Sequence, residues 1–159
     1  MIRGILLALV AVVGFTLPAQ ACPDFNRRPS QGVYSLVAGF QPDPQYVNIR
    51  AGGRINLGNC GHLPGFGFVA RSPDFSLNYT AGGYALTFLT RSSVDTVLLI
   101  NDPSGRWYFD DDSGASIGAG GLAAAIKFNN PQSGRYDVWI GLYNPGSGVP
   151  VRIEVSELY

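Results

Sequence analysis

Positive charge is scarce in this sequence of 159 residues, which has 11 basic and 11 acidic residues and a single lysine, Lys127. The other basic residues are arginines, and they are scattered along the chain instead of clustered. Binding to nucleic acid or to an anionic membrane surface requires a concentrated positive patch. The composition therefore excludes these two classes of partner.

Long apolar runs are also absent after residue 21. The only such run, Gly4 to Leu17, follows Arg3 and precedes Ala19-Gln20-Ala21, which fits the small-x-small rule of signal peptidase. The run is shorter than the roughly 20 residues of a membrane-spanning helix. Lipid attachment to Cys22 usually requires Leu and a small residue where Ala19 and Gln20 stand. We expect a signal peptide at 1–21 and one exported domain at 22–159, periplasmic or extracellular, with no insertion into the membrane.

Cysteine and histidine are rare, with only Cys22, Cys60 and His62 in the chain. A thiolate metal site would need a second cysteine pair or more histidines. In an oxidising compartment, the two cysteines instead predict one disulfide. On the chain-entropy model, closing a loop of about 40 residues stabilises a fold by roughly 4 kcal/mol.

Helix signals are nearly missing, whereas short segments of alternating or mixed apolar and polar residues recur between turns rich in Gly, Pro, Asn and Asp. Examples are Tyr46 to Arg50, Phe75 to Tyr79, Tyr84 to Phe88 and Val151 to Val155. This pattern predicts an all-β fold, an antiparallel β-sandwich of jelly-roll type.

One turn divides the stretch from Val94 to Phe109 into two expected strands. Asn101-Asp102-Pro103-Ser104-Gly105 has Asn and Pro to start a reversal and Gly to adopt a positive φ. We therefore predict a hairpin in which Trp107 and Phe109 share one face and Tyr108 lies on the other.

The clearest alternation lies between Tyr136 and Tyr143. Tyr136, Val138, Ile140 and Leu142 are expected in the core, which places Trp139 and Tyr143 on the opposite face. With Trp107 or Tyr108 from an adjacent strand, these aromatics could form a platform that grips a sugar or an extended peptide. The alternative is that both faces are packed, with a long N-terminal segment covering the second one.

Residues 94–143 carry a resemblance to a known family. The segments Asp95 to Gly105, Asp110 to Gly114, Ile126 to Phe128 and Ser133 to Gly141 together resemble the bacterial pre-peptidase C-terminal domain. The resemblance implies a secreted jelly-roll-like β-sandwich that is usually appended to peptidases. No peptidase segment precedes the pattern here, which favours a stand-alone role.

Three adjacent aspartates, Asp110, Asp111 and Asp112, form the most concentrated charge. Calcium prefers six to eight oxygen ligands, so a turn that converges these carboxylates could bind it, with Asp95, Asn101 or Asp102 contributing. In the alternative interpretation, the aspartates cap a turn by accepting hydrogen bonds from nearby amides. No other cofactor is expected.

Catalysis has little support in the sequence. Asp112-Ser113-Gly114 is similar to the surroundings of a serine-protease nucleophile, but such chemistry needs a histidine base and an oriented carboxylate. His62, the only histidine, lacks the sequence surroundings of a catalytic base. We predict a non-catalytic interaction or adhesion module that recognises a protein or glycan of the cell envelope or extracellular matrix. The alternatives are a peptidase or peptidase-associated protein, and a structural secreted protein without a small ligand.

Overall fold

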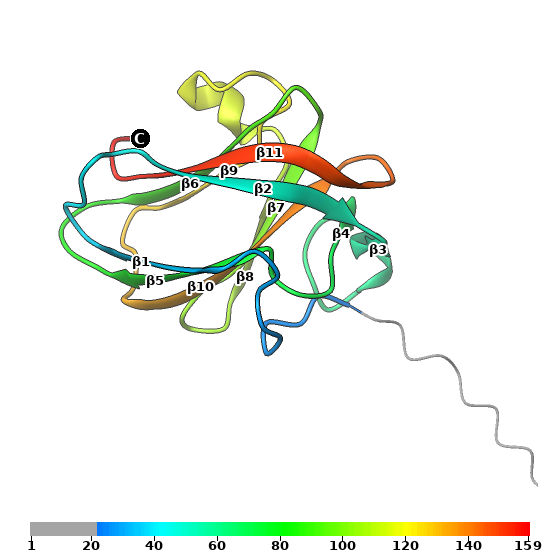
Figure 1. The fold of residues 1–159 in the computed structure, drawn as a ribbon, viewed down its shortest axis with the longest axis horizontal. Coiled ribbons are helices and arrows are strands. Elements are labelled where there is room, and N and C mark those ends of the chain that lie inside the picture. The colour runs from blue at the N-terminus through cyan, green and yellow to red at the C-terminus, as the bar shows by residue number, and fades with distance from the viewer. Residues whose placement is uncertain (1–21) are drawn as a thin grey trace, which may run out of the picture.

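The computed structural model describes residues 22–159, so the predicted signal peptide at 1–21 lies outside the described residues. Two β-sheets face each other (Figure 1). Sheet A contains β1 (Val33–Val37), β3 (Ile55–Asn56), β4 (Phe68–Val69), β5 (Phe75–Thr80), β7 (Thr96–Asn101), β8 (Trp107–Asp110) and β10 (Gly134–Leu142). Sheet B contains β2 (Gln45–Gly53), β6 (Leu86–Arg91), β9 (Ala125–Phe128) and β11 (Gly146–Ser156). Within residues 22–159 the helical elements are two 3-10 turns, η1 (Leu57–Asn59) and η2 (Ser113–Ile117). The predicted all-β sandwich is confirmed.

Each sheet is organised around a strand from the end of the chain. In sheet A, β10 pairs with β5 and β4 and also with β7, which in turn pairs with β8. In sheet B, β11 lies between β2 and β6, and β9 pairs with β6. All of these pairs are antiparallel, but the edge strand β1 pairs with β5 in parallel. The sheet is therefore antiparallel except at this one edge.

The main core fills the space between the sheets, because the inward residues of each strand are apolar. Tyr136, Val138 and Ile140 of β10 are buried there, as their alternation predicts. Ile153 and Val155 of β11, in the other sheet, belong to the same core cluster. The alternating pattern therefore gives the correct inward face for both central strands.

A second apolar cluster covers the opposite face of sheet A. It is built from Leu57, Cys60, Leu63, Val69, Val97, Leu99 and Trp139, with Trp107 and Phe109 packed against it. Residues 54–70 supply the cover, and the Cys22–Cys60 disulfide ties the start of the described chain to it, with a Cα–Cα distance of 5.9 Å. The predicted cysteine pair is thus joined, and both faces of sheet A are packed.

No helix within 22–159 has both the length and the apolar character that a span would require.

Candidate functional site

The predicted hairpin is present as β7 and β8, and its turn is organised by one buried carboxylate. Asp102 Oδ1 accepts hydrogen bonds from Ser104 N (2.9 Å), Ser104 Oγ (2.6 Å) and Arg106 N (3.0 Å). Asp102 Oδ2 accepts one from the Tyr108 hydroxyl (3.1 Å). Burial alone would raise the pKa of Asp102, but these hydrogen bonds outweigh it and hold the pKa below its usual value. Asp102 is therefore a structural carboxylate that fixes the turn.

A second charged group lies beside this turn. Asp137 on β10 accepts hydrogen bonds from Ser76 Oγ and Arg135 Nε (2.8 Å), and its Oδ1 lies 2.7 Å from Arg135 Nη2. Arg135 Nη2 also donates to the Phe25 carbonyl oxygen (3.3 Å). Burial raises the pKa of Asp137, although the bonds from Ser76 and Arg135 oppose this. The guanidinium of Arg135 is therefore held in one orientation while its side chain stays 45% exposed.

The two arrangements border an open cleft of about 450 Å³. Its walls come from the Asn101–Gly105 turn, from Ser133, Gly134 and Arg135, and from Phe25 and Asn26 of the N-terminal segment. Gly134 has a φ of 141°, and a Cβ there would lie 2.7 Å from Pro103 Cβ. Glycine at this position therefore lets the two turns approach each other and shape the cleft.

A neighbouring cleft of about 270 Å³ lies on the other side of Asp102. Tyr108, Phe128 and Tyr136 supply its aromatic lining, and Arg106 and Lys127 supply its positive charge. Arg106 Cζ lies 5.9 Å from the centre of the Tyr108 ring. Asp102 lines both clefts, so they lie on either side of the hairpin turn. Asp102 and Asp137 are buried, whereas Arg106, Lys127 and Arg135 are exposed.

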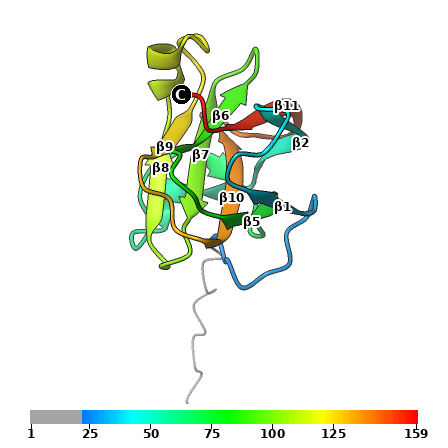
Figure 2. The ribbon, with the colours of Figure 1, turned by 90° about the vertical axis from the view of Figure 1, so that its left-hand side faces the viewer.

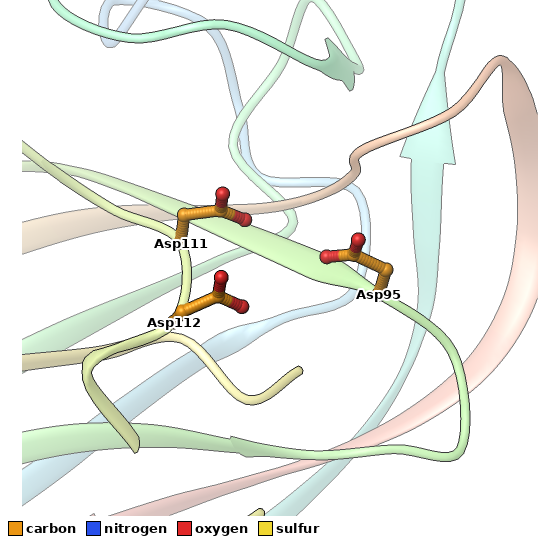
Figure 3. Close-up of side chains that lie close together, drawn as sticks. All are labelled: Asp95, Asp111 and Asp112. Atoms are coloured by element: carbon orange, nitrogen blue, oxygen red, sulfur yellow. The ribbon is translucent and has the colours of Figure 1, made fainter. Parts of the chain in front are cut away.

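The opposite end of the same hairpin carries three carboxylates from two strands. Figure 3 shows Asp95, before β7, facing Asp111 and Asp112, after β8, and their oxygens lie within 4.8 Å of one another. Asp95 Oδ1 and Asp111 Oδ1 are buried and have no hydrogen-bond partner in the described part of the chain, 22–159. Burial, followed by repulsion from Asp112, Asp95 and Asp110, raises the pKa of Asp111 to about 6. The arrangement concentrates negative charge that nearby donors do not neutralise.

Asp110 is placed differently from its two neighbours. Its carboxylate accepts hydrogen bonds from the backbone N–H of Ser113 (3.0 Å) and of Ala125 (2.8 Å), and from the Ser113 hydroxyl. It therefore caps the turn at η2, as the alternative interpretation of the aspartate run describes. These bonds occupy Asp110, and Asp95, from the other strand of the hairpin, completes the group with Asp111 and Asp112.

The predicted aromatic platform is corrected by the structure. Trp139 is fully buried, because residues 54–70 cover the face on which it lies, and it packs on Trp107 with ring centres 5.2 Å apart. Tyr108 lies on the inner side against Phe128. Tyr143 alone of the four is well exposed, at 47%, and it contacts Phe66 instead of another platform residue. The four aromatics therefore do not form one exposed row.

Ser113 and His62 belong to different parts of the fold. The hydroxyl of Ser113, at the start of η2, donates to Asp110, at the end of β8, whereas His62 is exposed in the turn after η1. Neither residue lines the two clefts.

Sequence reasoning missed Arg135 and Asp137 as candidate functional residues. The only available signal was that Ser133-Gly134-Arg135-Tyr136-Asp137 belongs to the family-like pattern, which does not show that it would meet Asn101–Gly105. That meeting depends on the pairing of β10 with β7, in which Asp137 lies opposite Asn101.

The chain has little similarity to known proteins. No protein-family model and no curated protein matches the chain. Among solved structures, PliG of Aeromonas hydrophila, a periplasmic lysozyme inhibitor of g-type lysozyme, is similar at 13% identity and a TM-score of 0.36. That similarity covers 80% of this chain and 98% of PliG. A TM-score at this level carries no argument about function.

Proposed function

We propose that the protein is an exported, non-catalytic interaction module that recognises a protein or glycan through the two clefts flanking the hairpin turn. The observation that carries this proposal is the fixed guanidinium of Arg135 at the border of the larger cleft. A pre-oriented arginine loses little conformational freedom when it binds a carboxylate or hydroxyl group. Functional surfaces of this kind are commonly concave, with a few placed polar groups.

The charges of the clefts indicate which ligand groups fit. The acids, Asp102 and Asp137, are buried and hydrogen-bonded, whereas Arg106 and Lys127 are exposed. A ligand therefore meets the positive groups first, and aromatic rings of the smaller cleft offer stacking surfaces. We propose that the ligand carries carboxylates, either on an acidic glycan or on an acidic protein surface of the cell envelope or extracellular matrix.

The test compares the mature protein with Arg135→Gln, in the larger cleft, and with Arg106→Gln/Lys127→Gln, in the smaller one, on a glycan array and in pull-downs from envelope extracts. All three side chains are exposed, and both variants should lose capture of acidic ligands, while thermal melts check that they are folded. Arg54→Gln/Arg71→Gln, which removes two exposed arginines outside the two clefts, is the control. Equal capture by the mature protein and all three variants would contradict the assignment to the clefts, and the two formats separate a glycan from a protein ligand.

The position of the family-like segments supports the same surface. Asn101–Gly105 and Ser133–Gly141 belong to the segments that carry the resemblance to the pre-peptidase C-terminal domain, and residues of both line the larger cleft. We therefore also propose that the chain belongs to that family. Attachment to a peptidase would be a different role, and detection of a peptidase as the captured partner would favour it.

We also propose calcium binding by Asp95, Asp111 and Asp112. The supporting observation is that two oxygens of the group, Asp95 Oδ1 and Asp111 Oδ1, are buried without a donor among residues 22–159, as unpartnered oxygens suit a divalent ion. Calcium at 100 times its dissociation constant would stabilise the folded state by about 2.7 kcal/mol. Thermal melts in excess calcium and in chelator should therefore differ for the wild type but not for Asp111→Asn/Asp112→Asn.

Magnesium in place of calcium is the control, because it keeps its own water ligands and demands octahedral geometry. Identical melts with calcium and with chelator would contradict the calcium proposal.

Export is proposed together with this function. Support comes from the Cys22–Cys60 bond, because disulfides persist in oxidising compartments. The intact mass of native protein from the periplasm or medium should match residues 22–159 and should not change on alkylation without reductant. An alkylated cysteine, or a lipid-sized mass increase at Cys22, would contradict it.

We propose no peptidase activity. Support comes from the positions of Ser113, whose hydroxyl donates to a turn-capping carboxylate, and of His62, which lies in another part of the fold. Cleavage of casein that is lost in Ser113→Ala or His62→Ala would overturn this part of the proposal.

A further inference from the structure

Among residues 22–159, no strand pairs with the outer side of the edge strand β1. Ser76 N donates to Gly32 O (3.1 Å) at one end of β1, and Ala38 N donates to Thr80 O (2.9 Å) at the other. In a parallel pair, residues that bond to the neighbouring strand alternate with residues that do not. The backbone N–H and C=O groups of Val33, Ser35 and Val37 therefore point away from β5, at the end of the strand order of sheet A.

This free edge borders an apolar slot. The edge strands β1 and β2 lie on the same side of the sandwich, at the right in Figure 2. Between them is a cavity of about 230 Å³, whose walls include Tyr34 and Tyr46 and whose lining includes the buried core residues Leu77 and Val155. The slot therefore leads from the free backbone edge directly to the core between the sheets.

The edge also lacks the usual protection against pairing. Natural edge strands commonly carry charged side chains, especially lysine, that prevent another strand from adding. Residues 29–42 contain no charged residue, and Val33 and Val37 are 57% and 63% exposed. In contrast, β9 at the far edge of sheet B carries Lys127. The β1 edge is thus uncharged, apolar and open.

We propose that β1 is a docking edge for an extended, uncharged segment of a partner protein, which adds to sheet A as a further strand. Its backbone would bond to Val33, Ser35 and Val37, and its alternate apolar side chains would enter the slot. A helix or a glycan could not supply a continuous row of backbone donors and acceptors. The surface is separate from the two clefts, so either assignment can fail without the other.

A second copy of the chain fits this edge less well. Stable dimers bury about 800 Å² on each partner. An edge of five residues is only about 17 Å long, so pairing of β1 with itself would supply a small part of that area. We therefore propose a segment of a partner protein, and not a second copy of the chain, as the occupant of the β1 edge.

The probe is a synthetic peptide of alternating valine and threonine, with two terminal lysines for solubility and a fluorophore, titrated with the mature protein. We expect binding with a dissociation constant of about 1 mM or tighter. Ser35→Pro removes the central outward N–H but keeps the pairing with β5, so it should weaken binding about tenfold. Ser35→Ala keeps the N–H and should bind normally, and thermal melts check that both variants are folded.

Two N-methylated forms of the peptide make the test independent of the variants. One is methylated at the valine amides and the other at the threonine amides, so each blocks one edge of the peptide strand. Binding should be lost for one of them and kept for the other. Loss of both, loss of neither, or absence of binding by the parent peptide would overturn the proposal. A dimer of the mature protein that Ser35→Pro dissociates would also overturn it, because the occupant would then be a second copy.

Discussion

The two ends of the β7–β8 hairpin hold carboxylates in opposite conditions. At the turn end, Asp102 is 5% exposed and accepts hydrogen bonds from Ser104, Arg106 and Tyr108, and its pKa is lowered. At the other end, Asp111 has a buried oxygen without a donor and three acidic neighbours, and its pKa is raised to about 6. Asp102 is buried and Asp111 has one buried oxygen, so the supply of donors decides whether each carboxylate stabilises the fold or opposes it.

The largest change in the free energy of unfolding is expected from removing the carboxylate of Asp102, which accepts several hydrogen bonds. Asp102→Ala should lower the free energy of unfolding by about 3 kcal/mol, because several donors lose their acceptor in a largely buried turn. Urea unfolding measures this loss. Asp102→Asn, which keeps one acceptor oxygen, should lose less, and a loss below about 0.5 kcal/mol in Asp102→Ala would show that water replaces the carboxylate.

At the Asp111 end of the hairpin, removing the charge is expected to stabilise the fold instead. Asp111→Asn should raise the free energy of unfolding at neutral pH by about 1 kcal/mol in the absence of calcium, because it removes a charge that is repelled by Asp95 and Asp112. The same urea measurement in the presence of chelator detects it. A destabilised variant would indicate that Asp111 has a favourable partner in solution.

The pH dependence separates the two ends further. Because the pKa of Asp111 is higher in the folded than in the unfolded chain, the folded state binds more protons between pH 4 and 6, and stability from this group falls as the pH rises through that window. The pKa of Asp102 is lowered, so its contribution is present above the unfolded value and is lost as the pH falls below about 4. Burial also raises the pKa of Asp74, to about 7, and that of Asp95, so Asp111→Asn should reduce the first change without abolishing it and should leave the second, as unfolding curves across pH would show.

The smallest change in stability is expected from removing one hydrogen bond at the turn end, the bond from the Ser104 hydroxyl to Asp102. Ser104→Ala removes the hydroxyl donor at 2.6 Å from Asp102 Oδ1 but leaves the backbone donors, so we expect a loss of about 0.5 kcal/mol. Ser116→Ala, in η2, also removes a hydroxyl that bonds locally and is the matched control. A loss as large as that of Asp102→Ala would show that the hydroxyl, and not the carboxylate, fixes the turn.

The sequence predicts local structure well where a pattern repeats. The alternation of β10 and the chemistry of the Asn101–Gly105 turn predict the inward residues and the hairpin, because both depend on neighbouring residues alone. The same alternation also places Trp139 correctly on the opposite face of β10. What it cannot predict is that residues 54–70 return to cover that face, since the cover comes from a distant part of the chain.

The candidate sites depend on such distant relations. Asp95 joins Asp111 and Asp112 only because the hairpin returns β8 to the start of β7, and a hydrogen bond to the backbone of Ala125 helps to hold Asp110 away from them. Arg135 reaches the larger cleft only in the register that pairs Asp137 with Asn101. Residue type indicates which groups can bind a ligand, whereas strand pairing decides which groups meet.

The central positions of β10 and β11 have a consequence for the order of folding. These strands are the last two along the chain. Nevertheless, β10 lies between β5 and β7 and pairs with both, and β11 lies between β2 and β6 and pairs with both. During synthesis, β5 and β7 of sheet A and β2 and β6 of sheet B are therefore made before their central partners, β10 and β11. Pairings this distant in sequence also make folding slow. The nascent chain should thus stay largely unfolded until its final 25 or so residues are available, and only then can both layers close together.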